Sequence, residues 1–290
     1  MKVLITGANG QVGSRLVERL NRKAEILAMD RDVLDITNRE AIFKTVEGFK
    51  PNVIINAAAH TAVDRAEQEV ELSYGINRDG PLYLAEAAQS TGAIILHIST
   101  DYVFNGENEK PYVESDAVDP KSIYGRSKLE GELAVANACQ RHIILRTAWV
   151  FGEDGNNFVK TMLRLGKERD TLGVVADQFG GPTYAGDIAD ALILIAEKTQ
   201  SHDFNQWGIF HFSGMPYVSW FEFADKIFSI AIEKMVLDKK PTLSQLTTQD
   251  YPTPAQRPNF SKLNCEKINH TFKIKPSDWI RALEDIYLYK

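Results

Sequence analysis

Short apolar runs alternate with amphipathic stretches through the first half of the chain. Runs rich in Val, Ile and Leu lie at 2–6, 25–29 and 53–56, and similar runs follow at 93–99 and 143–146. Strands that are apolar along their whole length are buried on both faces, which is typical of parallel sheets. The pattern therefore predicts a parallel sheet.

Helical periodicity fills the gaps between these predicted strands. Helices are expected at 12–22, 38–49, 62–76, 81–90 and 122–138. Thr37 or Asn38 is the expected N-cap of the second helix. Alternation of strand and helix predicts an α/β fold, a doubly wound parallel sheet of Rossmann type.

The pattern loosens after residue 150. Further helices are expected at 157–167, 187–198 and 220–234. The stretch Asp238 to Asn264 is rich in Pro, Thr and Gln and is predicted to be mostly loop. We divide the chain into an NAD(P)-binding Rossmann domain, 1–150, and a smaller substrate-binding lobe, 151–290, with segments that return to the main sheet.

Composition narrows the classes of function. The 290 residues are 44% hydrophobic and 25% charged, and the net charge is -6 without a long basic run, which argues against nucleic-acid binding. No secretory signal or apolar stretch of membrane-spanning length is seen, so a cytoplasmic location is expected. Cys139 and Cys265 are expected to be free thiols. The six histidines lack metal-ligand spacing, and no catalytic metal is predicted.

A glycine-rich turn follows the first predicted strand. It reads Gly7-Ala8-Asn9-Gly10-Gln11-Val12-Gly13 and opens a helix. Glycine permits a tight turn and close approach of a pyrophosphate, which then lies at the positive end of the helix. The turn predicts a dinucleotide cofactor, with Gly-x-x-Gly-x-x-Gly spacing.

The choice between NADH and NADPH stays open. Asp30 ends the second predicted strand, where a carboxylate can bind ribose hydroxyls and would repel a 2′-phosphate. Arg31 follows directly and could pair with that phosphate. Small residues after the third strand, Ala57, Ala58 and Ala59, would let the dinucleotide lie against the backbone.

Thr100, Tyr124 and Lys128 supply a carbonyl-binding hydroxyl, a phenol and an ammonium. Tyr124 and Lys128 are spaced i,i+4, so they share one face of a helix. A nearby ammonium lowers the pKa of a phenol, which is near 10 in free tyrosine. These groups can protonate a ketone while a hydride arrives. A Tyr-x-x-x-Lys match alone is common by chance. The glycine turn upstream favours a catalytic role for this match, because it predicts a cofactor site in the same chain.

Taken together, these motifs resemble the dTDP-4-dehydrorhamnose reductase family of extended short-chain dehydrogenases/reductases over essentially the full length. The matching segments are Gly7–Gly13, Asn56–Asp64, Ser99–Phe104, Tyr124–Lys128, Arg146–Val150, Gly155–Phe158, Asp177–Thr183 and Arg257-Pro258. The first and fourth are shared by the whole superfamily, and the others are more specific.

The resemblance implies reduction of the C4 ketone of a nucleotide sugar, dTDP-4-dehydro-L-rhamnose, by NADPH or NADH. Tyr124 would donate the proton, Lys128 would lower its pKa and bind the nicotinamide ribose, and Thr100 would bind the carbonyl. The expected cofactor contacts are Gly7, Gly10, Gln11, Val12, Gly13, Asp30, Asp35, Ile36, Ala57, Ala58, Ala59, His60, Thr61, Tyr124 and Lys128. The expected substrate contacts are Val63, Thr100, Asp101 and Trp149, with Gln178 and Arg257 for the diphosphate. Homodimer formation is left open.

Three other functions share these features. A nucleotide-sugar 4,6-dehydratase would carry glutamate where this chain has Tyr102, which argues against elimination of water. A 4-epimerase uses the same three groups and would retain NAD through turnover. A non-catalytic regulatory subunit of methionine adenosyltransferase keeps the fold, but the intact Thr100, Tyr124 and Lys128 favour catalysis.

Overall fold

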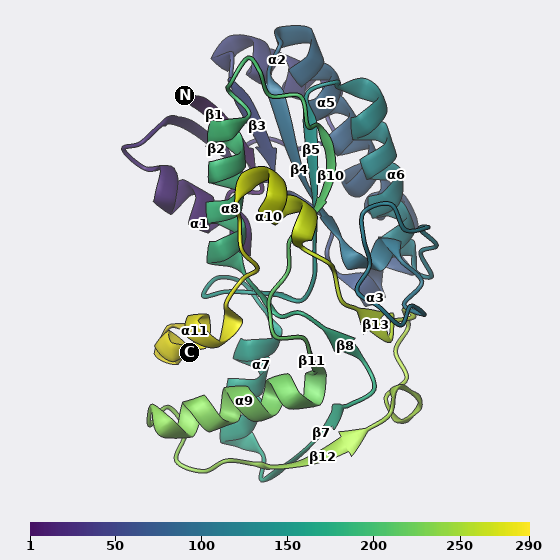
Figure 1. The fold of residues 1–290 in the computed structure, drawn as a ribbon, viewed down its shortest axis with the longest axis vertical. Coiled ribbons are helices and arrows are strands. Elements are labelled where there is room, and N and C mark those ends of the chain that lie inside the picture. The colour runs from purple at the N-terminus through teal and green to yellow at the C-terminus, as the bar shows by residue number, and fades with distance from the viewer.

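Six parallel strands form the main sheet of the upper lobe in Figure 1, in a computed structural model that describes residues 1–290. In spatial order they are β10 (Gly208–His211), β5 (His142–Thr147), β4 (Ile94–Thr100), β3 (Val53–Asn56), β1 (Lys2–Thr6) and β2 (Glu25–Met29). Every pair in this sheet is parallel. The predicted doubly wound α/β fold is confirmed.

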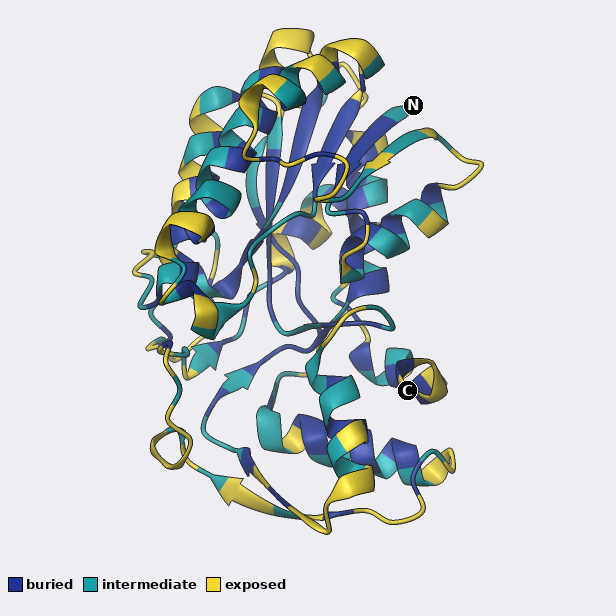
Figure 2. Cartoon of the chain, turned by 180° about the vertical axis from the view of Figure 1, so that it is seen from behind, coloured by how far each residue is buried: buried dark blue, intermediate teal, exposed yellow.

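Helices cover both faces of this sheet, and the four central strands, β5, β4, β3 and β1, are buried between them, whereas the edge strand β2 is partly exposed (Figure 2). Side chains alternate along each strand: Val3 and Ile5 pack on one side, and Leu4 on the other. The Val3 side is covered by α1 (Gln11–Leu20), α8 (Ala185–Lys198) and α10 (Glu266–Phe272). The Leu4 side is covered by α2 (Arg39–Phe49), α5 (Gly80–Thr91) and α6 (Ile123–Ala138).

The lower lobe has its own apolar core, in which Phe223, Phe228 and Trp279 are fully or almost fully buried. Its helices are α7 (Phe158–Glu168), α9 (Trp220–Glu233) and α11 (Trp279–Ala282), followed by the 3₁₀ segment η4 (Leu283–Tyr289). Its small sheets pair β7 (Thr171–Val175) with β12 (Thr242–Leu246), β6 (Val150–Phe151) with β9 (Thr183–Tyr184), and β8 (Phe179–Gly180) with β11 (Val218–Ser219) and β13 (Phe260–Ser261).

The lobes are not two consecutive halves of the chain. After β9 the chain returns to the upper lobe as α8 and β10, and after β13 it returns once more as α10 (Figure 1). Phe210 of β10 and Ile268 of α10 therefore complete the core that Val3 and Ile5 begin.

Most predicted elements lie within two residues of their expected bounds, and one expectation is wrong in part. The single helix expected at 62–76 is broken into α3 (Val63–Ala66) and α4 (Val70–Tyr74), and a π-helical turn, η1 (Gly75–Asp79), then leads into α5. The Asn77 side chain in that turn accepts from the His60 N–H at 2.8 Å and donates to the His60 carbonyl. These two bonds tie η1 to the loop after β3.

The stretch 238–264 is mostly loop, as expected, and it also contains the short strands β12 and β13. Their local sequence is polar, and each is stabilised by pairing with a distant strand, β7 or β8. The cap of α2 is Asn38, whose side chain accepts from the Ala41 N–H at 3.0 Å.

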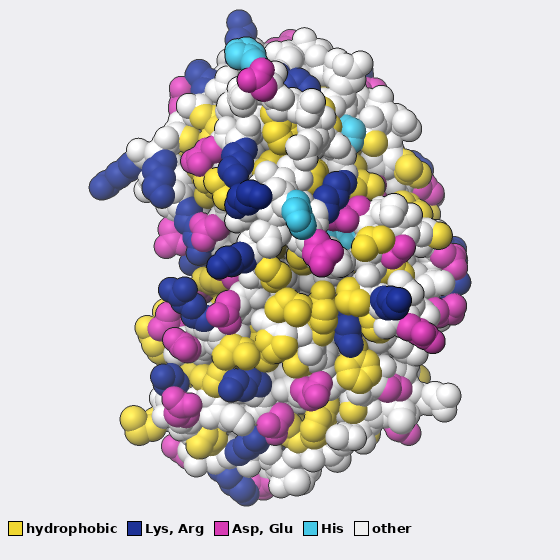
Figure 3. Space-filling view, in the orientation of Figure 1, with side chains coloured by type: hydrophobic (Ala, Val, Ile, Leu, Met, Phe, Trp, Pro, Cys, Tyr) yellow, Lys and Arg dark blue, Asp and Glu magenta, His cyan; other side chains and the backbone are white.

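Charges of both signs are scattered over the face drawn in Figure 3, and apolar side chains gather between α10 and α9. None of the helices is long and apolar enough to span a bilayer.

Candidate active site

A cleft of about 490 Å³ opens at the carboxyl edge of the main sheet. The chain runs from β1 to β2 on one side and from β3 to β4 on the other, and ligands of doubly wound sheets bind at such a switch point. Of the predicted site residues, the cleft is lined by Gly10, Gln11, Val12, Ala57, Ala58, Ala59, Thr61, Val63, Thr100, Asp101, Tyr124, Lys128 and Trp149. Glycine-turn, small-residue and catalytic candidates therefore meet in one cavity.

The glycine turn brings backbone against backbone. Gly7 has φ +70°, and a Cβ there would lie 2.6 Å from the Ala58 nitrogen, so only glycine fits. The Gly10 N–H donates to the Gly7 carbonyl at 3.0 Å, and α1 begins directly afterwards without a side-chain cap. The first N–H groups of α1 are thus left for a ligand, and an anion is the ligand that a helix N-terminus favours.

Several predicted cofactor contacts lie outside the cleft lining. Asp30 accepts from the Asp32 and Val33 N–H groups and from the Asn9 amide. The side chains of Asp35 and Ile36 are also engaged elsewhere, Asp35 with Thr37 and Ile36 against Gly80. Likewise, His60 contacts Ser73 and Glu69 through its ring. Gly7 and Gly13 shape the turn beneath the lining. Their cofactor roles stay predictions.

Helix α6 carries Tyr124 and Lys128 into the cleft. Its first turn is capped by Ser122, whose Oγ accepts from the Gly125 N–H at 3.1 Å. A Cβ on Gly125 would lie 2.3 Å from the Tyr102 carbonyl oxygen, so glycine lets α6 approach the end of β4. That approach sets Tyr124 beside Thr100.

Burial dominates the titration of both groups. Burial raises the pKa of Tyr124 to about 12, although the Thr100 hydroxyl lowers it and the Asp101 carboxylate raises it further. Burial lowers the pKa of Lys128 to about 8, against the raising effect of Glu132. The Lys128 ammonium donates to the Ile98 carbonyl at 2.6 Å. It is not among the groups that shift the Tyr124 pKa, so the expected lowering is not seen in this structure.

The end of β4 presents a hydroxyl and a carboxyl side by side. The Thr100 hydroxyl donates to Asp101 Oδ1 at 3.1 Å and accepts from the Tyr102 N–H at 3.2 Å. Burial raises the pKa of Asp101 to about 6, while the nearby hydroxyls of Ser261 and Thr100 lower it. The second carboxyl oxygen is buried without a partner, which is a preorganised acceptor for a ligand donor.

Sequence reasoning missed several lining residues. Ser99 and Thr147 each bury a hydroxyl without a partner at the cleft wall, and Gly155 and Asn156 line its rim. Thr147 pairs with Thr100 across β5 and β4, so the register of two distant strands places it. Its position two residues before Trp149 in the chain was the available signal.

The ring of Tyr102 meets the ring of Tyr124 edge to face, with 5.4 Å between ring centroids. Burial raises the pKa of Tyr102, and the Asp101 carboxylate raises it further. A phenol held neutral in this way is a poor base, which agrees with the argument against a dehydratase.

The two residues expected to hold a diphosphate lie away from the cleft lining. The Gln178 side chain is buried and donates to Thr248 Oγ1 at 3.1 Å. Arg257 makes two hydrogen bonds to Asp64, at 3.0 and 2.7 Å. We name this Asp64–Arg257 pair the α3 tie. The diphosphate roles of both residues stay predictions.

Comparison with known proteins identifies the family. A family model described as "RmlD substrate binding domain" matches residues 1–288. The dTDP-4-dehydrorhamnose reductase of Aggregatibacter actinomycetemcomitans is 53% identical over 290 residues, 99% of both chains. The chain belongs to the dTDP-4-dehydrorhamnose reductase family.

Solved structures of the dTDP-4-dehydrorhamnose reductase family share this fold. The enzyme of Clostridium acetobutylicum superposes with TM-score 0.91 at 43% identity, covering 98% of each chain. The enzyme of Bacillus anthracis, solved in complex with NADP, gives TM-score 0.92 at 39% identity, covering 100% of this chain and 99% of the other.

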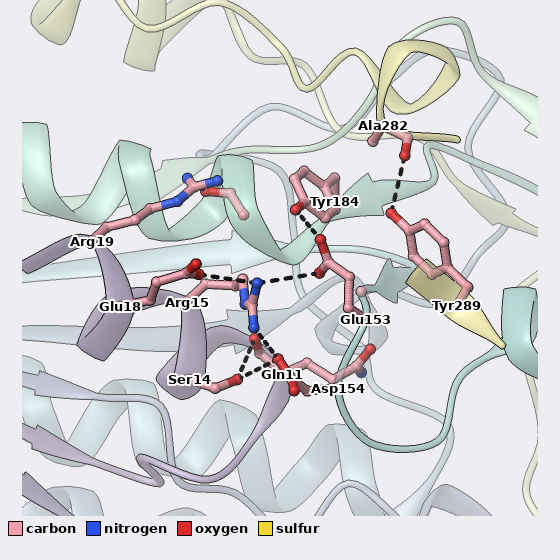
Figure 4. A network of polar contacts seen from close by, with 12 residues as sticks. Gln11, Ser14, Arg15, Glu18, Arg19, Glu153, Asp154, Tyr184, Ala282 and Tyr289 are labelled. Atoms are coloured by element: carbon pink, nitrogen blue, oxygen red, sulfur yellow. Dashed lines mark hydrogen bonds and ion pairs between the residues drawn. The ribbon is translucent and has the colours of Figure 1, made fainter. Parts of the chain in front are cut away.

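In this member of the dTDP-4-dehydrorhamnose reductase family, a second tie joins the lobes beside α1 (Figure 4). Arg15 and Ser14 both donate to Asp154 Oδ2, at 2.7 and 2.8 Å. The Arg15 guanidinium also faces Glu153, which accepts from the Tyr184 hydroxyl. The Asn157 amide donates to Gln11 Oε1 at 3.0 Å. We name this network, formed by Gln11, Ser14, Arg15, Glu153, Asp154, Asn157 and Tyr184, the α1 tie.

Proposed function

We propose that the chain reduces the C4 ketone of dTDP-4-dehydro-β-L-rhamnose to the alcohol of dTDP-L-rhamnose, with NADPH or NADH as reductant. This reaction would serve dTDP-rhamnose and cell-surface polysaccharide biosynthesis. Relatives named for this activity match the chain at up to 53% identity over nearly full length. The NADP complex of the Bacillus anthracis relative supports the cofactor class.

The observation that carries the proposal is the meeting of Thr100, Tyr124 and Lys128 with the glycine turn in one cleft. The bound nicotinamide cofactor supplies the hydride. The raised pKa of Tyr124, about 12, keeps its phenol protonated at neutral pH. The phenol therefore carries the proton that it donates to the developing alkoxide. Thr100 is placed to donate to the same oxygen once its bond to Asp101 is exchanged. Donors fixed in advance at a developing oxyanion are commonly worth about 3 kcal/mol in the barrier.

Lys128 has a separate part in this proposal. Its ammonium is held at the Ile98 carbonyl, on the cleft wall, where the ribose of a bound nicotinamide cofactor can meet it. A charge on Lys128 would stabilise the phenolate that remains after Tyr124 gives up its proton. Solvent then returns a proton to Tyr124, and the atoms balance: one hydride and one proton are added across the C4 carbonyl.

The deciding experiment follows loss of nicotinamide absorbance with dTDP-4-dehydro-L-rhamnose, in wild type and Tyr124→Phe. The variant is expected to lose at least about 100-fold in kcat, the usual contribution of a general acid, and to keep its affinity for NADPH. A wild type inactive with both reductants would overturn the reductase proposal. An equally active variant would overturn the role of Tyr124.

Two further results separate the alternatives. Tightly bound NAD that survives purification and supports interconversion of C4 epimers would favour an epimerase. Binding of a methionine adenosyltransferase without reduction of any nucleotide sugar would favour a regulator. The proposed setting is cytoplasmic, and sedimentation of the purified chain decides between monomer and homodimer.

A further inference from the structure

Trp149 stands in an unusual backbone conformation at the cleft wall. It follows β5, lines the cleft and has φ +49°, in the left-handed region that bulky side chains rarely adopt. Its carbonyl accepts from the Thr183 N–H at 3.1 Å. One backbone bond does not determine where an indole ring points, so other contacts must hold this side chain.

Trp220 supplies the principal contact. The indole rings of Trp149 and Trp220 stack with 3.6 Å between centroids and 10° between planes. Trp220 is the first residue of α9, and Ser219 caps that helix through a reciprocal pair of bonds with Glu222. Phe158 of α7 also packs on the Trp220 ring, with 4.6 Å between ring centroids. Contacts other than Trp149 therefore hold Trp220 in place.

Gly180 leaves room for the same ring. A Cβ at Gly180 would lie 2.5 Å from Cε2 of Trp149, closer than real carbon atoms approach. Strand β8, which carries Gly180, is held on both sides, by β11 and by β13. The ring of Trp149 thus packs against a stacked indole and a bare backbone, and Trp149 lines the cleft together with Tyr124 and Thr100.

We propose that Trp220 is a positioning residue, which holds Trp149 in its left-handed conformation so that the free surface of that ring packs on the sugar of a nucleotide-sugar substrate. The inference rests on the proposed function for the identity of the ligand. An aromatic wall contributes apolar contact and orientation, and a sugar presents C–H groups that pack on such a wall. Trp220 does not line the cleft, so its effect passes through Trp149.

The first test compares Trp220→Leu with Trp220→Phe. Trp220→Leu removes the stacking ring and is expected to raise KM for the nucleotide sugar about tenfold, since misplaced contacts cost binding and orientation. Trp220→Phe keeps a stacking ring and is expected to restore most of that loss. Affinity for NADPH is expected to stay unchanged in both. The control is Phe228→Leu, which removes a buried ring from the same helix without contacting Trp149 and is expected to leave KM unchanged. Unchanged KM in a folded Trp220→Leu would overturn the proposal.

A double-mutant cycle separates positioning from general loss of packing. If Trp220 acts through Trp149, then Trp149→Ala with Trp220→Leu should raise KM no more than Trp149→Ala alone. Additive losses would overturn the proposal. Gly180→Ala displaces the same ring from another side and is expected to raise KM without touching α9, so it keeps the test valid if Trp220→Leu fails to fold.

A spectroscopic readout does not depend on turnover. Two stacked indoles give an exciton couplet in the far-ultraviolet circular dichroism of the wild type, which Trp220→Phe and Trp149→Phe should each abolish. Absence of a couplet that responds to both variants would overturn the stacking. A wild type that reduces no nucleotide sugar but shows the couplet would instead sink the proposed function, so the two failures are distinguishable.

Discussion

The two ties between the lobes are built differently. The α1 tie joins several side chains that share donors and acceptors, and Arg15 and Glu153 in it are mostly buried, with 21% and 14% of their side chains exposed. The α3 tie rests mainly on one ion pair, Asp64–Arg257, in which 39% and 27% of the side chains are exposed. The shared and less exposed bonds of the α1 tie should cost more to break, whereas a single partly exposed pair is released by one competitor. We infer that the α1 side is the fixed side of the cleft.

The largest expected effect is on stability, at the α1 tie. Arg15→Ala would remove the guanidinium that Glu153 and Asp154 share, and we expect it to lower the free energy of unfolding by about 2 kcal/mol, less than for a fully buried pair. Urea unfolding of the two proteins measures this. Arg164→Ala, in the exposed pair Arg164–Glu168, is the matched control and should cost about 0.5 kcal/mol or less. Equal losses in the two variants would contradict the comparison.

The pH dependence of kcat/KM tests the protonation state of Lys128, which lines the cleft between the two ties. Burial lowers the pKa of Lys128 to about 8, so its charge is present below pH 8 and is lost as pH rises. Because kcat/KM reports groups of the free enzyme, kcat/KM for NADPH is expected to fall as pH rises through about 8, towards tenfold per pH unit. Lys128→Arg would keep its charge and remove this fall. A profile that stays flat to pH 10 would contradict the assignment.

The smallest expected effects are at the α3 tie. Arg257→Ala removes an ion pair that is partly exposed, so the free energy of unfolding should fall by about 1 kcal/mol or less. If Arg257 moves from Asp64 to the diphosphate when substrate binds, Arg257→Ala should also raise KM for the nucleotide sugar several-fold. Arg257→Lys, which lacks the paired donors of arginine, should restore KM only partly. The α3 tie should also weaken with added salt, more than the α1 tie does. A stability loss equal to that of Arg15→Ala would break the comparison.

Local pattern was enough to predict the strands of the main sheet up to β5 and the catalytic helix α6. Strand burial, the glycine turn and the Tyr124–Lys128 spacing are all properties of short segments. Neither tie could be predicted in this way, because Arg15 and Asp154 are 139 positions apart and Asp64 and Arg257 are 193 apart. Strand β12 was missed for the same reason, since its polar sequence gains order only from β7.

The residues of the site also divide into those that the sequence could predict and those that only the folded structure brings together. The residues that meet backbone to backbone at Gly7 and Ala58 follow from the order of the strands. The partner of Trp149 does not, since Trp220 reaches it only when β8 and β11 pair. The suggested diphosphate contacts, Gln178 and Arg257, were taken from motifs, and their side chains have other partners here.

The interleaving of the lobes has a consequence for synthesis of the chain. The upper core closes only when Phe210 of β10 and Phe272 of α10 pack against strands made much earlier. A ribosome therefore releases the first strands and helices long before their apolar surfaces can be covered. Unlike a protein whose leading domain folds by itself, this chain must wait for its last fifth, and its nascent intermediates should be clients of chaperones during that interval.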